Sequence, residues 1–288
     1  NISEDDQEML QMKFDKMYTT KDIYTIYNWM LDDCGCDLLP EVPYEKRKLP
    51  YEDVFPMLYL KYRLSGGNST HKNIKHLVID EMQDYTYLQY TILESLFHCR
   101  MTILGDRAQT LDTKQQDVLR FLPKLLGREI RTIEIKKSYR NTLEIARYAE
   151  KVSGVSDLEL LDRHGKEVVE KTFNTDTELL DELVCRLKCP GDFETAALIT
   201  TTEEEAFDLS RLLKLRGINV SYVDRNSSAF KKGLTVTTFY LAKGLEFDQV
   251  FALRGAKENP LKNQAEYICA TRALHELYVY EIADSLAK

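Results

Sequence analysis

Two adjacent carboxylates, Asp80 and Glu81, are the side chains of this sequence best suited to chemistry at a phosphate group. They follow the apolar run 76–79, which predicts a buried β-strand. At the carboxyl end of a buried parallel strand, acidic residues lie at the edge where open α/β sheets bind ligands. One carboxylate can hold Mg²⁺ there, while the other polarises a water aimed at a phosphate. Because a lone Asp-Glu pair is more often a solvated turn, this interpretation needs support from other residues.

Four further polar clusters occur at the ends of predicted strands or near the ends of predicted helices. They are Gly105-Asp106-Arg107-Ala108-Gln109, Ser138-Tyr139-Arg140-Asn141, Ala242-Lys243-Gly244-Leu245-Glu246-Phe247 and Thr271-Arg272-Ala273. The first cluster ends a strand predicted at 101–104, close in sequence to the acidic pair, and parallel strands present such ends at one edge of a sheet. Taken alone, Arg140 is more simply a surface arginine at the start of a helix.

The elements that must position these clusters alternate between strand and helix from residue 75 onward. Strands are predicted at 76–79, 101–104, 131–135, 166–173, 195–200, 218–223, 234–238, 248–253 and 275–280. Helices are predicted at 87–97, 115–126, 143–152, 178–187, 203–216 and 264–273, with a loop at 157–165. Residues 1–70 are expected to be helical and irregular, with helices at 18–31 and 51–64. This alternation predicts an α/β fold with mostly parallel sheets.

Length and composition are those of a globular protein of two ordinary domains. The chain has 288 residues, of which 43% are hydrophobic and 30% charged. A formal net charge of −8 argues against a global basic field for nucleic acid. The six scattered cysteines have no second ligand pair at zinc-finger spacing and indicate reduced thiols. No signal peptide or membrane-spanning apolar run occurs, so we expect a cytoplasmic protein without a membrane partner.

Taken together and in this order, the clusters resemble the motifs of superfamily 1A helicases of the UvrD/Rep type. Residues 80–84 resemble the Walker B box, 105–109 motif III and 138–141 motif IV. Thr238 with 242–247 is similar to motif V, and Tyr267 with 271–273 to motif VI. Within that superfamily the sequence most resembles the HelD-like group of RNA-polymerase-associated ATPases, which is helicase IV-like. The segments that point there are 51–64, 240–247 and 269–277.

The resemblance implies two RecA-like P-loop NTPase-type domains, each a parallel sheet with flanking helices, the first of them incomplete. Residues 1–130 would be the C-terminal part of motor domain 1A with a helical N-terminal segment, and 131–288 would be motor domain 2A. The cofactors implied are ATP and Mg²⁺, and the partners are DNA, RNA polymerase or both.

The resemblance also implies a role for individual residues. Asp80 would hold Mg²⁺, Glu81 would be the catalytic base and Gln109 would sense the γ-phosphate. Arg140 and Arg272 would be arginine fingers, which stabilise charge on the transferring phosphoryl oxygens. The nucleotide-binding residues would be Tyr139 against adenine, with Gly244 and Glu246 near the ribose.

Two departures from the family pattern qualify these expectations. No Gly-x-x-x-x-Gly-Lys-Ser/Thr phosphate-binding loop occurs, and the sequence begins at Asn1 without an initiator Met. We therefore expect a C-terminal fragment that lacks the N-terminal P-loop segment of the same protein and is inactive alone. The second departure is that Gln109 is followed by 110–114 without an aromatic residue or arginine, and Tyr240 stands where UvrD-type motif V has His.

Aromatic stacking is a main source of strand-binding energy, so these changes favour action on RNA polymerase–DNA complexes over processive unwinding. A non-enzymatic helicase-like interaction module remains the alternative.

Overall fold

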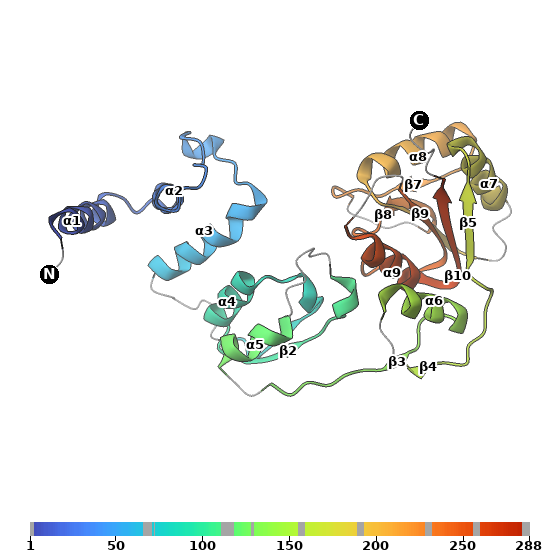
Figure 1. The fold of residues 1–288 in the computed structure, drawn as a ribbon, viewed down its shortest axis with the longest axis horizontal. Helices are drawn as coiled ribbons and strands as arrows, with labels where there is room; N and C mark the ends of the chain where they lie inside the picture. The colour runs from blue at the N-terminus through green and yellow to red at the C-terminus, as the bar shows by residue number, and fades with distance from the viewer. Residues whose placement is uncertain are drawn as a thin grey trace. The chain divides into compact units, whose positions relative to one another are not determined.

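The structure is a computed structural model of the chain, shown in Figure 1. It describes residues 3–65, 71, 73–110, 118–127, 130–154, 159–188, 193–227, 232–255 and 260–283. The chain divides into two compact units. Unit 1 is Asn1–Gly105 with Gln116–Ile130, and unit 2 is Asp106–Gln115 with Arg131–Lys288. The assignment of residues 1–130 and 131–288 as motor domains 1A and 2A stays a prediction.

Unit 1 contains a helical segment followed by a small parallel sheet. The helical segment comprises α1 (Glu4–Thr19), α2 (Ile23–Asp33), η1 (Tyr44–Lys46) and α3 (Tyr51–Leu64). The rest comprises β1 (His76–Ile79), η2 (Met82–Asp84), α4 (Tyr87–Leu96), β2 (Arg100–Ile103) and α5 (Val118–Leu126). Strands β1 and β2 pair in parallel. Ile79 of β1 packs with Tyr90 of α4 and Leu122 of α5, so a core lies directly beneath the residues that follow β1.

Unit 2 is built on a six-stranded parallel sheet with the strand order β5-β10-β9-β6-β8-β7. Its strands are β5 (Val169–Phe173), β6 (Thr195–Thr200), β7 (Ser221–Tyr222), β8 (Gly233–Thr238), β9 (Phe247–Arg254) and β10 (Ala273–Ile282). Its helices are α6 (Leu143–Ser153), α7 (Asp176–Lys188), α8 (Glu203–Leu215) and α9 (Lys262–Arg272), with η3 (Arg107–Gln109) as a short turn. β3 (Lys137–Ser138) and β4 (Glu159–Leu160) form a separate two-stranded sheet.

Helices cover both faces of the large sheet, as Figure 1 shows. Ala197 and Ile199 of β6 pack in the cluster that includes α6 and α9. Leu198, which lies between them, packs in the cluster that includes α7 and α8. Successive strand residues point to opposite faces, so an unbroken apolar strand requires cover on both sides. The predicted α/β class with helix-flanked parallel strands is confirmed.

Several predicted elements differ from the structure. The run 76–79 forms a strand as predicted, but it is not buried throughout, since only Ile79 is buried and the Val78 side chain is 61% exposed. The strand predicted at 131–135 is wrong, since 131–136 form no strand and the Ile133 and Ile135 side chains are 70% and 81% exposed. Alternating apolar residues are insufficient for a strand that has no neighbour to complete its backbone hydrogen bonds. Pairing begins only at β3, whose partner β4 lies in the segment predicted as a loop at 157–165. The strand predicted at 218–223 shortens to β7, and residues 115–117 of a predicted helix lie outside the described residues.

Candidate functional site

The acidic pair of unit 1 lies in a strained turn directly after β1. Glu81 has φ 52° and ψ 49°, and it is the only non-glycine residue with positive φ in the described part of the chain. Its N–H donates to Asp80 Oδ1 at 2.8 Å, and its Oε2 accepts a hydrogen bond from Gln83 Nε2 at 2.6 Å. A left-handed conformation costs an ordinary residue about 1–2 kcal/mol, and such strain is concentrated at functional sites. The turn therefore holds Glu81 in a defined orientation at a cost in stability.

Gly105 supports this turn from the end of the neighbouring strand. The Met82 N–H donates to the Leu104 carbonyl at 2.8 Å, which joins the acidic turn to the segment that follows β2. A Cβ atom at Gly105 would lie 2.7 Å from the Met82 backbone nitrogen and would also collide with the Gln83 side chain. Only a glycine permits this close approach of the two segments.

We expect Gly105→Ala to destabilise unit 1 by about 1–3 kcal/mol, because a backbone atom cannot move aside as easily as a side chain. Chemical denaturation followed by circular dichroism would measure the loss. Gly255→Ala is the matched control, since a Cβ there would meet mainly the end of the Glu205 side chain, with its Oε1 at 2.7 Å. Equal losses for the two variants would contradict the proposed role of Gly105.

A connected polar network in unit 2 joins η3 to α9. Gln109 Nε2 donates to Asp106 Oδ2 at 2.9 Å, and the Tyr267 hydroxyl donates to the same oxygen at 2.9 Å. Arg272 Nη2 donates to Gln109 Oε1 at 3.2 Å. The fold therefore brings together residues that are more than 160 positions apart in the chain.

The residues of this network are buried, which raises the free-energy cost of breaking their hydrogen bonds. Arg272 is 3% exposed and Gln109 is 9% exposed. Burial and the nearby Asp106 carboxylate raise the pKa of Tyr267, so its hydroxyl stays a donor. A buried guanidinium that loses its hydrogen-bonding partners is costly, which favours one arrangement of these side chains.

The segment 242–247 takes part in two further contacts of the same network, both to backbone carbonyls. Lys243 Nζ donates to the Gln109 carbonyl at 2.9 Å, and Arg272 Nη1 lies 3.4 Å from the Leu245 carbonyl oxygen. Three separate polar clusters of the sequence thus converge around Gln109 and Arg272.

Arg140 and Glu246 form a second pair in unit 2. Arg140 Nε lies 2.7 Å from Glu246 Oε1, and both side chains are roughly half exposed. Tyr139 is 61% exposed. Gly244 has φ 77° in open space, a conformation that other residues rarely adopt. The structure brings Arg140 to Glu246 and Gln109 to Arg272, while Asp80 and Glu81 belong to the other unit.

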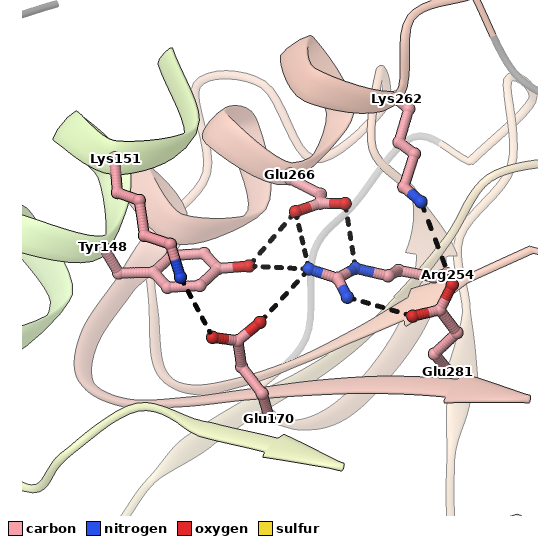
Figure 2. A network of polar contacts seen from close by, with 7 residues as sticks. All are labelled: Tyr148, Lys151, Glu170, Arg254, Lys262, Glu266 and Glu281. Atoms are coloured by element: carbon pink, nitrogen blue, oxygen red, sulfur yellow. Dashed lines mark hydrogen bonds and ion pairs between the residues drawn. The ribbon is translucent and has the colours of Figure 1, made fainter. Parts of the chain in front are cut away.

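A charged network beneath α9 fixes the helix that carries Tyr267 and Arg272 (Figure 2). Arg254 on β9 contacts Glu266 of α9 through Nε at 2.8 Å and Nη2 at 2.9 Å. It also contacts Glu281 at 3.0 Å and Glu170 at 3.4 Å. Since Glu266 immediately precedes Tyr267, this network anchors the helical turn from which Tyr267 reaches Asp106.

Sequence reasoning assigned no role to Asp106, Lys243 or Tyr267, although all three lay within segments compared with helicase motifs. One feature of the sequence could have identified them. Each is a polar side chain inside an otherwise apolar or glycine-containing segment. Their partners could not be read from the sequence, because each partner comes from a distant element.

The described residues include no group of three or more His, Cys, Asp or Glu side chains arranged to hold a metal ion. Asp80 nevertheless fits Mg²⁺, which proteins commonly bind through one or two carboxylates together with water and substrate phosphates. Its exposed carboxylate follows a parallel strand, and only Oδ1 receives the Glu81 N–H. Separately, no helix among the described residues is long and apolar enough to cross a membrane.

Comparison with known proteins gives partial structural similarities. No protein-family model and no curated protein matches the chain. The C-terminal domain of a possible DNA helicase from Lactobacillus plantarum WCFS1 is similar over 50% of this chain and 88% of its own, with 26% identity and a TM-score of 0.42. The PRRSV helicase is similar over 74% of this chain, with 18% identity and a TM-score of 0.42. This chain covers 36% of the PRRSV helicase.

Proposed function

We propose that the chain is part of an ATP-dependent superfamily 1 motor of the UvrD/Rep type, nearest to the HelD-like group. The contact between Gln109 and Arg272 is the observation that carries the proposal. These residues come from segments that separately resemble motifs III and VI, and the resemblance assigns both to the γ-phosphate. Their buried contact supports that assignment, because it orients an amide and a guanidinium together.

Each unit supplies a different part of the proposed chemistry. In unit 1, Asp80 would hold Mg²⁺ and Glu81 would orient the attacking water and accept its proton. In unit 2, Gln109, Arg140 and Arg272 would stabilise negative charge on the phosphoryl oxygens. Bound ATP with Mg²⁺ would supply the transferable phosphoryl group.

Three further residues of unit 2 would contact the nucleotide itself. The half-exposed Glu246 and Gly244, whose backbone lies in open space, would meet the ribose, and the exposed Tyr139 ring would stack on adenine.

The substrate that we favour is an RNA polymerase–DNA complex in the cytoplasm. Tyr240 supports this choice, because its hydroxyl donates to Glu203 at 2.8 Å and Arg225 pairs with the same carboxylate at 2.7 Å. A tyrosine bonded to a carboxylate is a poorer platform for an anionic strand than a free aromatic ring. The net charge of −8 also disfavours tight binding to a bare nucleic-acid strand. Duplex unwinding by the protein would instead indicate a DNA helicase.

The complete open reading frame that contains these residues provides the test. We expect its product to hydrolyse ATP with Mg²⁺, and we expect Glu81→Gln to lower kcat by at least about a hundredfold, as loss of a general base does. Release of RNA polymerase from DNA would be followed in the same samples by gel shift. The 288-residue chain is the control and should be inactive, since it contains no Gly-x-x-x-x-Gly-Lys-Ser/Thr. ATPase activity of this chain that Glu81→Gln removes would contradict the control, and a product without ATPase activity would favour a non-enzymatic interaction module.

A further inference from the structure

The segment 162–165 contacts the start of α6. The Leu143 N–H donates to the Arg163 carbonyl at 2.8 Å, which gives one first-turn donor of the helix a partner. The Gly165 N–H donates to Glu144 Oε2 at 2.8 Å. Two hydrogen bonds therefore join the segment 162–165 to the first residues of α6.

Arg163 connects the segment 162–165 to the backbone of Arg140. Arg163 Nη1 donates to the Arg140 carbonyl at 2.9 Å, and Nη2 contacts His275 Nδ1 at 3.0 Å. His275 lies on β10, so one guanidinium ties Arg140 to the large sheet. The Arg140 side chain then extends to Glu246 at 2.7 Å. Both ends of Arg140 are thus held, the backbone by Arg163 and the side chain by Glu246.

The contact between Arg163 and His275 dictates the tautomer of the imidazole. A guanidinium can only donate, so His275 Nδ1 must be unprotonated and must accept. The remaining proton is then on Nε2, which faces Asp248 Oδ1 at 3.7 Å. Burial of Asp248 is outweighed by hydrogen bonds from Thr195, so the pKa of this carboxyl is lowered and it remains anionic. The ring also stacks on Phe193, with centroids 5.6 Å apart.

His164 has the opposite requirement. Its Nδ1 lies 2.8 Å from Glu144 Oε1, and its Nε2 lies 3.0 Å from Asp162 Oδ1. Both ring nitrogens face carboxylate oxygens, so both must carry a proton for the two contacts to be hydrogen bonds. The hydrogen bond to Glu144 raises the pKa of His164 above 6.5 and lowers the pKa of Glu144 to about 2.

The sign of the pH dependence follows from these two shifts. The raised pKa of His164 means that its contribution is present below about pH 6.5 and is lost as pH rises through the folded-state value. The lowered pKa of Glu144 means that its contribution is present above about pH 4.5 and is lost as pH falls toward 2.

We propose that Arg163 is a positioning residue for Arg140, and that the contacts of His164 with Glu144 and Asp162 hold the segment 162–165 that carries Arg163. Loss of a proton from His164 leaves Glu144 and Asp162 without a shared cation, so the positioning of Arg140 weakens as pH rises. The inference rests on the proposed function in one respect, namely that Arg140 serves the nucleotide.

Nitrogen-15 NMR of the imidazoles in the unmodified 288-residue chain tests the proton assignments without any variant. We expect the neutral ring of His275 to carry its proton on Nε2, and His164 to remain doubly protonated at a higher pH than in the urea-unfolded chain. A neutral His275 ring with its proton on Nδ1, or a His164 titration that matches the unfolded chain, would overturn the proposal.

Hydrogen exchange of the Arg140 Nε–H, normalised to its intrinsic rate, tests the positioning itself. We expect protection to fall about tenfold as pH rises through the His164 titration, the effect of one lost hydrogen bond. His275→Asn keeps an acceptor near the Nδ1 position, so it should retain the protection. His164→Lys keeps a cation, so it should abolish the loss at high pH.

Two further variants complete the exchange experiment. Arg163→Lys cannot bond to both partners as a planar fork and should lower protection at every pH. His98→Asn, in unit 1, is the control and should leave the whole profile unchanged. Flat protection in the unmodified chain, an unchanged fall in His164→Lys, or unchanged protection in Arg163→Lys would refute the positioning role. The readout needs no nucleotide, so its failure and the failure of the ATPase test are independent results.

Discussion

Arg254→Met is expected to lower the free energy of unfolding of unit 2 by about 3 kcal/mol, the usual loss when a buried ion pair keeps only one partner. The Arg254 side chain is 21% exposed and bridges Glu170, Glu266 and Glu281. Hydrogen bonds to Glu266 outweigh burial and raise the pKa of this arginine, so it is charged at any working pH. In the variant the three carboxylates repel one another, and the remaining cations that contact them among the described residues are the exposed Lys151 and Lys262.

Differential scanning calorimetry would measure the effect of Arg254→Met as a fall of about 6–12 °C in the unit 2 transition. Arg225→Met is the matched control, since Arg225 also pairs with one glutamate at 2.7 Å but is 71% exposed. A fall as small as that of Arg225→Met would show that the network in Figure 2 contributes little to stability.

Arg272→Met is expected to lower kcat for ATP hydrolysis about a thousandfold in the product of the complete open reading frame, the usual value of an arginine finger. KM for ATP should change much less, because the charge that Arg272 opposes develops mainly in the transition state. Arg272→Lys should recover little, since an ammonium cannot reproduce the paired contacts to Gln109 and the Leu245 carbonyl.

Because Arg272 is 3% exposed, the loss of activity must be separated from unfolding. Lys243→Met is the comparison, since it removes a contact to the Gln109 carbonyl from the same network but removes no proposed finger. We expect Lys243→Met to lower kcat less than tenfold at a similar change in melting temperature. If Arg272→Met keeps kcat within tenfold of the unmodified protein, Arg272 has only a structural role.

The two parts of the candidate site differed in how far the sequence revealed them. Asp80 and Glu81 could be identified because four mostly apolar residues immediately precede two carboxylates, which is a local pattern. The left-handed backbone conformation of Glu81 could not be predicted, since this conformation is common only for Gly and occasional for Asn or Asp. The need for glycine at position 105 could not be predicted either, because it arises from the close approach of the Met82 backbone in the neighbouring segment.

The fold shows the same division. Continuous apolar runs such as 195–200 and 248–253 predicted buried parallel strands, and both occur in the sheet. Residues 131–135 carry an alternating apolar pattern, which also predicts a strand, but they form none. Strand formation depends on a neighbouring strand as well as on composition, and the sequence does not specify that neighbour.

By itself, the sequence determined the α/β class, the positions of most helices and strands, and the residue types available at each turn. These properties follow from periodicity and side-chain chemistry, which act over a few residues. Only the tertiary structure decided that Tyr267 and Gln109 share the Asp106 carboxylate, that Arg272 reaches Gln109, and that Arg163 holds the Arg140 backbone. Each of these contacts joins distant parts of the chain, and a hydrogen bond depends on distance and angle, which packing sets and residue order does not reveal.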